Sequence, residues 1–309
     1  TIDIWAGNFC HYVTTPQLGV DQVGNIYCLF IRHSDSDTLV AEDGIEQAVT
    51  DKGPLAFGNI WGAKSTDNGK TWGASVDISE ETHRHGKAED WRSYANTPGH
   101  ALQLERGKYK GRIYVAANHS EGAPKSRFED YRAHGFYSDD HGKTFSLSES
   151  VDFPGGNEST AAELSDGRLM MNSRNQRGDK RMRIVSVSED GGNRWASSFF
   201  DSTLIDPVCQ GSVLNIEWKD NCAVLAFSNS ATANRRDSLM VRVSLDEGVT
   251  WKYSLLIDHD PDKKKDHTAY SDLVLVNKKT LGVLYERNGY KEILFQTIQL
   301  KKDFQPWKK

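Results

Sequence analysis

The sequence predicts an all-β protein of the β-propeller class. A turn motif, Ser-x-Asp-x-Gly-x-x-aromatic, occurs four times, beginning at residues 65, 138, 188 and 244. Short apolar segments separate the copies, and no segment shows the sustained 3.6-residue apolar period of a long helix. A supersecondary unit that recurs at this kind of spacing, with about four strands in each unit, is typical of propellers.

The four copies of the motif indicate corners between strands. They read STDNGKTW (65–72), SDDHGKTF (138–145), SEDGGNRW (188–195) and SLDEGVTW (244–251). In such a corner the Asp accepts hydrogen bonds from its own turn, the Gly adopts a positive φ and the ring packs inward. Identical corners repeated around a fold cannot all face one site, so we interpret the motif aspartates as structural rather than catalytic.

Further strands are predicted by apolar segments that alternate or are β-branched, with Gly, Asn and Asp between them. These segments are 111–118, 167–174, 183–188, 222–228, 239–244, 281–286 and 292–300. The segment from His33 to Gly58 is acidic and polar, and we expect it to be an irregular surface loop. No linker or low-complexity stretch divides the chain, so residues 1–309 are expected to form a single domain.

The composition is that of a globular chain and excludes several classes of protein. Of 309 residues, 37% are hydrophobic and 26% charged, and 8 Trp, 11 Tyr and 12 Phe provide for a sizeable core. The formal net charge of −5 argues against nucleic acid or an anionic membrane as a partner, because such binders carry basic stripes. The densest basic run, 263–265, lies among aspartates and indicates a solvated loop. No stretch approaches the roughly 18 apolar residues of a membrane-spanning helix.

The cysteines point to no metal or redox centre. Cys10, Cys28, Cys209 and Cys222 fall outside any C-x-x-C spacing, which argues against a structural zinc site or a thioredoxin-like centre. Two disulfides and four thiols fit this pattern equally well. The sequence therefore predicts no cofactor and leaves the redox compartment open.

Several segments resemble, in the same order, those of the exo-sialidase (neuraminidase) family. They are TPGHALQL (97–104), GRIYVAANHS (111–120), NESTAAELSDGRLMMNSRNQ (157–176), CQGSVL (209–214), FSNS (227–230), RRDSLMVRVS (235–244), AYSDL (269–273) and LGVLYE (281–286). The resemblance covers nearly the whole chain. It implies a six-bladed propeller whose corners are the family's Asp boxes, and a glycoside hydrolase that removes terminal sialic acids with retention of configuration.

The resemblance also implies roles for five residues. Tyr270 in AYSDL occupies the position of the nucleophile, and Glu158 in NEST that of the carboxylate that takes the tyrosine proton. Arg174 and Arg236 match two of the family's three arginines that bind the substrate carboxylate. Glu286 in LYE matches the acid that holds the remaining arginine in place.

The chemistry of sialic acid explains these residue types. A sialic acid carries a carboxylate on its anomeric carbon, so a carboxylate nucleophile would approach a like charge, whereas a neutral Tyr activated by a neighbouring Glu avoids this repulsion. Arginine suits the substrate carboxylate because a planar guanidinium can bind it through two parallel hydrogen bonds. The scheme requires no metal.

Two of these assignments have a competing neighbour in the sequence. Glu163 belongs to the ELSDG hairpin, whereas Glu158 precedes it by five residues, as the family spacing requires. Arg235 lies next to Arg236, but Arg236 stands six residues before Arg242, which fits the family's R-x-(N/D)-L run. We therefore expect Glu163 to be a hairpin residue and Arg236 to be the substrate-binding arginine.

The sequence departs from the family at its start. The family's arginine in an (F/Y)RIP motif and the Asp that serves as general acid are not found, and residues 11–30 resemble the second family blade. The first blade is therefore expected to be incomplete. Either a segment preceding Thr1 or a companion chain supplies the third arginine and the acid, or the chain is a relative of the sialidases that has lost or rebuilt its first blade. An acid from the 33–58 loop, which contains Asp35, Asp37 and Asp43, is the alternative.

Three functions fit the sequence. The first is a retaining exo-α-sialidase acting on sialylated glycans. The second is a non-catalytic propeller that binds sialic acid through the arginines, and the third is a glycosidase for a related acidic 2-keto sugar. A substrate of this class favours a secreted, periplasmic or lumenal location.

Overall fold

A computed structural model of the chain describes residues 12–33, 38–42, 45–50, 53–54, 59–84, 91–219, 221–262 and 265–304. These residues form mainly antiparallel sheets, and their α-helices, α1 (Ser79–Thr82) and α2 (Leu300–Asp303), have four residues each. Neither helix is long and apolar enough to cross a membrane, and the described residues contain no other candidate span. The prediction of an all-β fold is confirmed.

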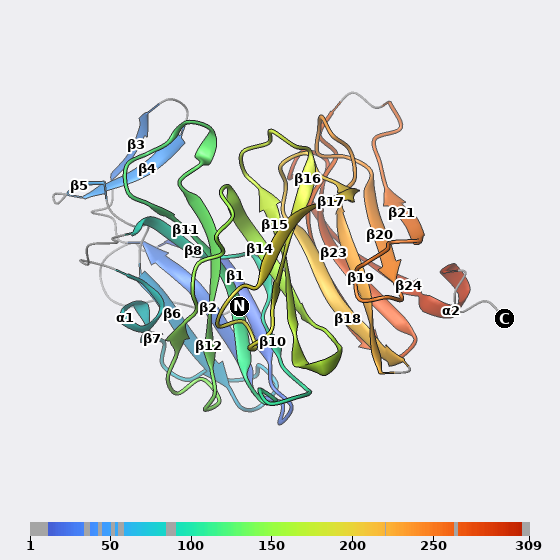
Figure 1. Ribbon diagram of the computed structural model, residues 1–309, viewed down its shortest axis with the longest axis horizontal. Helices are drawn as coiled ribbons and strands as arrows, with labels where there is room; N and C mark the ends of the chain where they lie inside the picture. The colour runs from blue at the N-terminus through green and yellow to red at the C-terminus, as the bar shows by residue number, and fades with distance from the viewer. Residues whose placement is uncertain are drawn as a thin grey trace.

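Five sheets follow one another around the molecule as blades (Figure 1). Blade 1 contains β1 (Tyr12–Val20), β2 (Ile26–His33), β6 (Asn59–Ser65) and β7 (Val76–Asp77), with β9 (Gly99–His100) parallel to β1. Blade 2 contains β8 (Trp91–Asn96), β10 (Leu102–Gln103), β11 (Ile113–Glu121), β12 (Tyr131–Ser138) and β13 (Ser146–Leu147). Blade 3 contains β14 (Gly156–Glu163), β15 (Leu169–Asn175), β16 (Met182–Ser188) and β17 (Ser197–Ile205).

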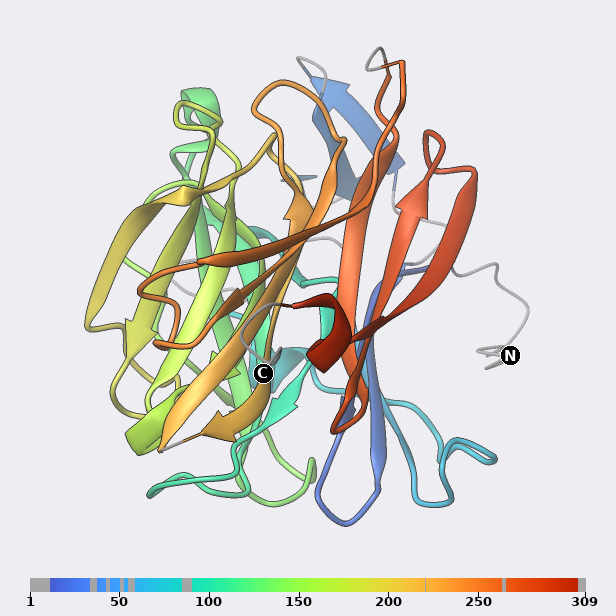
Figure 2. The same cartoon turned by 90° about the vertical axis from the view of Figure 1, so that its right-hand side faces the viewer.

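The last two blades complete the described array. Blade 4 contains β18 (Gly211–Lys219), β19 (Cys222–Ser230), β20 (Leu239–Ser244) and β21 (Tyr253–Asp258). Blade 5 contains β22 (Thr268–Asn277), β23 (Thr280–Arg287) and β24 (Glu292–Gln299), and Figure 2 turns it and helix α2 toward the viewer. All seven predicted strand segments lie in these sheets, and the propeller class is confirmed. The described residues form five blades, not the six of the predicted type.

The prediction of an irregular loop between His33 and Gly58 is wrong for the described part of this segment. It contains a small sheet of β3 (Thr38–Glu42), β4 (Ile45–Thr50) and β5 (Gly53–Pro54). The reason is visible in TLVAE and IEQAVT, whose apolar and β-branched residues favour strands despite the acidic surroundings. The candidate acids Asp35, Asp37 and Asp43 lie outside the described residues.

The four corners are built alike. In each, the motif Asp accepts a backbone hydrogen bond from the residue four positions later, at 2.9, 3.0, 2.8 and 2.8 Å for Asp67, Asp140, Asp190 and Asp246. The motif glycines have φ of 78°, 74°, 88° and 83°. Hydrogen bonds from the Thr of the same turn lower the pKa of Asp67 and of Asp140 to about 2. These carboxylates are occupied within their own turns, as expected of structural residues.

Blade 2 contains a buried histidine pair. The Nδ1 atoms of His119 and His134 lie 2.9 Å apart, both side chains are buried, and Trp91 stacks on His119 at 3.8 Å. Burial lowers the pKa of both imidazoles, and nearby Arg132 lowers that of His119 further. The folded protein therefore keeps both rings neutral at a pH where the unfolded chain protonates them.

We expect acid to destabilise the protein through this pair. Because the unfolded state binds more protons, the free energy of unfolding falls as the pH drops below about 6.5, by up to about 1.4 kcal/mol per pH unit for each histidine. Urea unfolding between about pH 7.5 and 5.5 measures this slope, above the ordinary pKa values of Asp and Glu side chains. His134→Gln removes one of the two groups and should flatten the slope; an equal slope in both proteins would contradict the prediction.

Candidate active site

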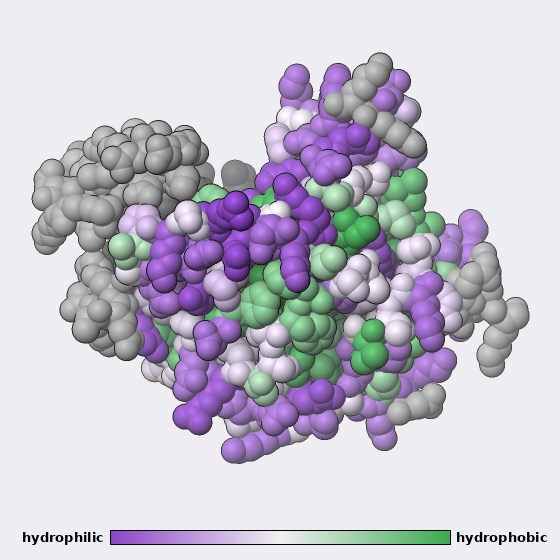
Figure 3. Space-filling model, turned by 45° about the horizontal axis from the view of Figure 1, so that its top comes forward, coloured by the Kyte–Doolittle hydropathy of each residue, from purple (hydrophilic) through white to green (hydrophobic). Residues whose placement is uncertain are grey.

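The candidate residues lie at one end of the propeller. They occupy the starts of β14 and β22, the end of β15 and the connection between β19 and β20, and antiparallel pairing brings these strand ends to the same edge of the blades. The connection after β21 rises at the top of Figure 1 and marks this end. Figure 3 turns the top forward and shows mainly hydrophilic residues around its rim.

Glu158 and Arg174 form an ion pair within blade 3. The pairing of β14 with β15 shifts register between Gly156 and Ser159, so Glu158 lies in a bulge, a feature that redirects side chains. Nη1 of Arg174 lies 2.7 Å from Oε2 of Glu158, and the two side chains are 12% and 13% exposed. Burial disfavours the charge of Arg174, but Glu158 and Tyr270 outweigh this effect, so the pKa of Arg174 is raised.

Tyr270 reaches this pair from blade 5. It also lies at a register shift, between Thr268 and Ser271 at the start of β22. Its hydroxyl donates to Oε1 of Glu158 and accepts a hydrogen bond from Nη1 of Arg174 at 3.2 Å. Burial, followed by the charge of Glu158, raises the pKa of Tyr270. The phenol is therefore neutral, with its proton directed at a carboxylate.

Arg236 approaches the same phenol from the β19–β20 loop of blade 4. Its guanidinium lies 5.6 Å from the centre of the Tyr270 ring. Nη1 donates to the Tyr290 hydroxyl at 3.1 Å and Nη2 to the Val208 carbonyl at 3.2 Å. Among the described residues no carboxylate pairs with this guanidinium, whereas Arg235 pairs with Asp237 at 3.0 Å. Arg236 thus retains a positive charge for an anionic ligand.

Two further glutamates take different positions. Oε2 of Glu286, on β23, accepts a hydrogen bond from the backbone N of Tyr270 at 3.2 Å and so holds the strand that carries the phenol. Among the described residues Glu286 forms no ion pair with an arginine, and its arginine-holding role stays a prediction. Glu163 lies at the opposite end of β14, where it accepts the backbone N–H groups of Glu105 and Arg106 at 2.7 and 2.9 Å. That is a structural role.

The structure adds contact residues that the sequence analysis did not single out. Tyr290 and Val208 both touch Arg236, and both have a positive φ, 67° and 66°. Positive φ is rare for bulky and β-branched side chains, and such strain concentrates at functional sites. Neither residue belongs to a motif, and a Val that acts through its carbonyl leaves no signal in the side-chain pattern.

Comparisons with known proteins concern the family and the fold. A family model described as a BNR repeat-like domain matches residues 39–283. The sialidase of Bacteroides fragilis (strain YCH46) is 31% identical over 77% of this chain, and that of Micromonospora viridifaciens 33% identical over 72%. The solved Hadza microbial sialidase Hz136 superposes with a TM-score of 0.73 at 25% identity, covering 94% of this chain and 53% of that one.

The blades and their corners define the class of protein, an Asp-box β-propeller. Within this class, the chain belongs to the sialidase family. It spans 41% of the length of the B. fragilis relative and 33% of that of the M. viridifaciens relative.

Proposed function

We propose that the chain is the catalytic propeller of a retaining exo-α-sialidase that hydrolyses terminal sialic acids from glycoconjugates. The observation that supports this most directly is the contact among Tyr270, Glu158 and Arg174, which joins blade 5 to blade 3. A phenol that donates to a carboxylate while an arginine holds that carboxylate is the arrangement that tyrosine nucleophilic catalysis needs.

In the first step, Oη of Tyr270 forms a bond with the anomeric carbon of the sialic acid. The bond from that carbon to the aglycone oxygen breaks, its electron pair stays on the oxygen, and a general acid supplies the proton. The phenolic proton passes to Glu158, which already accepts it in a hydrogen bond. The product is a sialyl-tyrosine intermediate with inverted configuration.

In the second step, water attacks the anomeric carbon from the face that the aglycone left. The base formed from the general acid takes the proton of the water, the carbon–Tyr270 bond breaks, and the phenolate recovers its proton from Glu158. Two inversions give net retention. Throughout, Arg174 and Arg236 bind the substrate carboxylate. Arg174 makes its contacts with described residues through Nη1 alone, which leaves Nη2 for the ligand.

A sialic-acid-binding propeller without turnover is the second candidate. It is favoured by one observation: the structure brings two arginines and the phenol together, but the sequence lacks the family's motifs for the third arginine and the general acid. Binding requires only the arginines, whereas cleavage of a natural glycoside also requires an acid. A glycosidase for a related acidic 2-keto sugar would use the same four side chains.

Turnover of two substrates separates these functions. We expect the purified chain to release sialic acid from an aryl sialoside, whose activated leaving group needs little acid assistance, with the α-anomer appearing first by NMR. Release from sialyl-lactose as well would show that an acid is supplied. Binding of sialic acid without release from the aryl sialoside or from sialyl-lactose would favour the second candidate. Cleavage of a related 2-keto sugar alone would favour the third candidate. The absence of both binding and release would overturn the proposal.

A further inference from the structure

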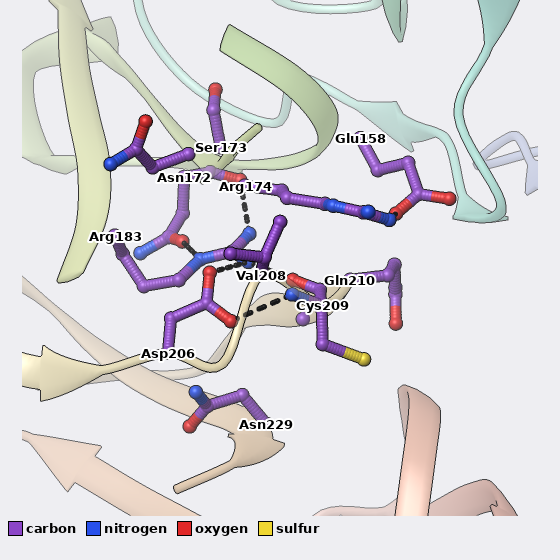
Figure 4. A network of polar contacts seen from close by, with 12 residues as sticks. Glu158, Asn172, Ser173, Arg174, Arg183, Asp206, Val208, Cys209, Gln210 and Asn229 are labelled. Atoms are coloured by element: carbon purple, nitrogen blue, oxygen red, sulfur yellow. Dashed lines mark hydrogen bonds and ion pairs between the residues drawn. The ribbon is translucent and has the colours of Figure 1, made fainter. Parts of the chain in front are cut away.

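A second arginine–carboxylate pair lies directly beneath the candidate site. Arg183 on β16 and Asp206 after β17 are 0% and 1% exposed, and Nη1 lies 3.0 Å from Oδ2 (Figure 4). Removing both charges from water costs free energy that their mutual attraction barely offsets, so a buried ion pair adds little to the stability of a fold. Its contacts indicate a different use.

Arg183 connects the strand of Arg174 to a turn. Its Nε donates to the Asn172 side chain at 2.7 Å and its Nη2 to the Asn172 backbone carbonyl at 3.3 Å. Asn172 precedes Arg174 by two residues on β15, so both side chains leave the strand on the same face. Nη1 of Arg183 also donates to the carbonyl of Cys209.

Asp206, the other member of the pair, fixes the turn formed by residues 206–210, which we call the clamp turn. Oδ1 of Asp206 accepts the backbone N–H of Cys209 at 2.9 Å, so the carboxylate and Arg183 hold both peptide groups of Cys209. Between them Val208 has a φ of 66°, a conformation that a β-branched residue adopts only when its surroundings impose it. This conformation aims the Val208 carbonyl at Nη2 of Arg236.

The clamp turn also touches the strand of the proposed nucleophile. Oε1 of Gln210 accepts the backbone N–H of Ser271 at 3.0 Å, one residue after Tyr270. One buried pair therefore links β15 with Arg174, the carbonyl that holds Arg236, and the start of β22. A carboxylate bound by two guanidinium groups requires a fixed distance between them, which rigid supporting contacts provide.

We propose that Arg183 and Asp206 are positioning residues that set the spacing of Arg174 and Arg236 by holding the clamp turn in its strained form. The proposal rests on the proposed function in assigning the two arginines to the substrate carboxylate. It assigns Arg183 and Asp206 no contact with the substrate, so their loss should weaken carboxylate binding while the bond-forming step changes little.

Asp206→Asn and Arg183→Lys test this on the full chain. Arg183→Lys keeps a positive charge beside Asp206 but not the planar fork of donors, so it preserves the fold if the asparagine variant does not. For each folded variant we expect the KM of an aryl sialoside to rise about tenfold or more, with kcat within about threefold. Adding Val208→Gly, which accepts a positive φ without strain, should recover at least part of the KM.

A control pair outside the site separates positioning from stability. Arg112 and Asp139, in blade 2, form another pair at 2.8 Å, with side chains 6% and 57% exposed. Asp139→Asn should lower the denaturant midpoint and leave KM unchanged. If Asp206→Asn and Arg183→Lys likewise change stability without changing KM, the proposal is wrong.

A readout that needs no substrate tests the clamp turn itself. Cys209 is 0% exposed and Cys28 5% exposed, and both are free thiols. Iodoacetamide labelling followed by peptide mass mapping should modify Cys209 about tenfold faster in the two variants, with Cys28 unchanged as the internal reference. Unchanged labelling of Cys209 overturns the inference. A wild-type chain that neither binds nor cleaves sialosides overturns the proposed function instead, while the labelling result still reports on the turn.

Discussion

Tyr270→Phe is expected to lower kcat for an aryl sialoside by about 10³-fold or more while leaving the Kd for sialic acid within about threefold. The substitution removes the one oxygen that would bond to the anomeric carbon and keeps the ring. The ion pair between Glu158 and Arg174, at 2.7 Å, does not depend on that oxygen. Binding through the arginines should therefore survive the loss of the chemical step.

Steady-state kinetics with the aryl sialoside gives kcat, and calorimetric titration of the same preparations with sialic acid gives Kd. Tyr137→Phe is the matched control, because its hydroxyl reaches only Asn193, at 3.3 Å, among the described residues and lies in blade 2. Its kcat should match that of the unaltered chain. A Tyr270→Phe protein that turns over at the original rate would contradict the nucleophile assignment. The nucleophile would then be another oxygen.

The propeller class is predictable from the sequence because its signals are local. A corner needs only a Ser, an Asp and a Gly at fixed offsets, and a strand needs only a short alternating segment. The blade count is less accessible because it depends on how sheets close on one another. The small sheet β3–β5 was missed for a related reason: acidic composition suggested a loop, whereas strand pairing overrode it.

The candidate site also contains residues that the sequence can indicate and residues that only the structure shows. Tyr270, Glu158 and Arg174 would act through their side chains in the proposed function, and they stand in motifs that resemble a family, so the sequence can indicate them. Arg183 and Asp206 lie in segments where the pattern shows only a strand and its end. Their proposed role rests on contacts that cross from β16 to the clamp turn, and a backbone carbonyl such as that of Val208 has no residue type to recognise.

Arg174→Ala should have the second large effect, on binding as well as on rate. Truncating one partner of a largely buried, hydrogen-bonded charge pair typically costs about 2–5 kcal/mol, which corresponds to roughly 30-fold to several thousand-fold in affinity. The substrate carboxylate loses one of its guanidinium partners, and Glu158 at 13% exposure loses the donor that orients it toward Tyr270. KM should therefore rise by about 100-fold and kcat should fall as well.

Arg174→Lys distinguishes charge from geometry. The ammonium keeps the positive charge but offers no planar fork, so we expect an affinity for sialic acid between those of the unaltered chain and Arg174→Ala. Arg235→Ala is the control, since Arg235 pairs with Asp237 outside the proposed carboxylate contacts, and it should bind sialic acid as the unaltered chain does. If all three variants bind sialic acid equally well in calorimetric titration, Arg174 does not contact the carboxylate. Its contacts with Glu158 and Tyr270 would then serve only to hold the phenol.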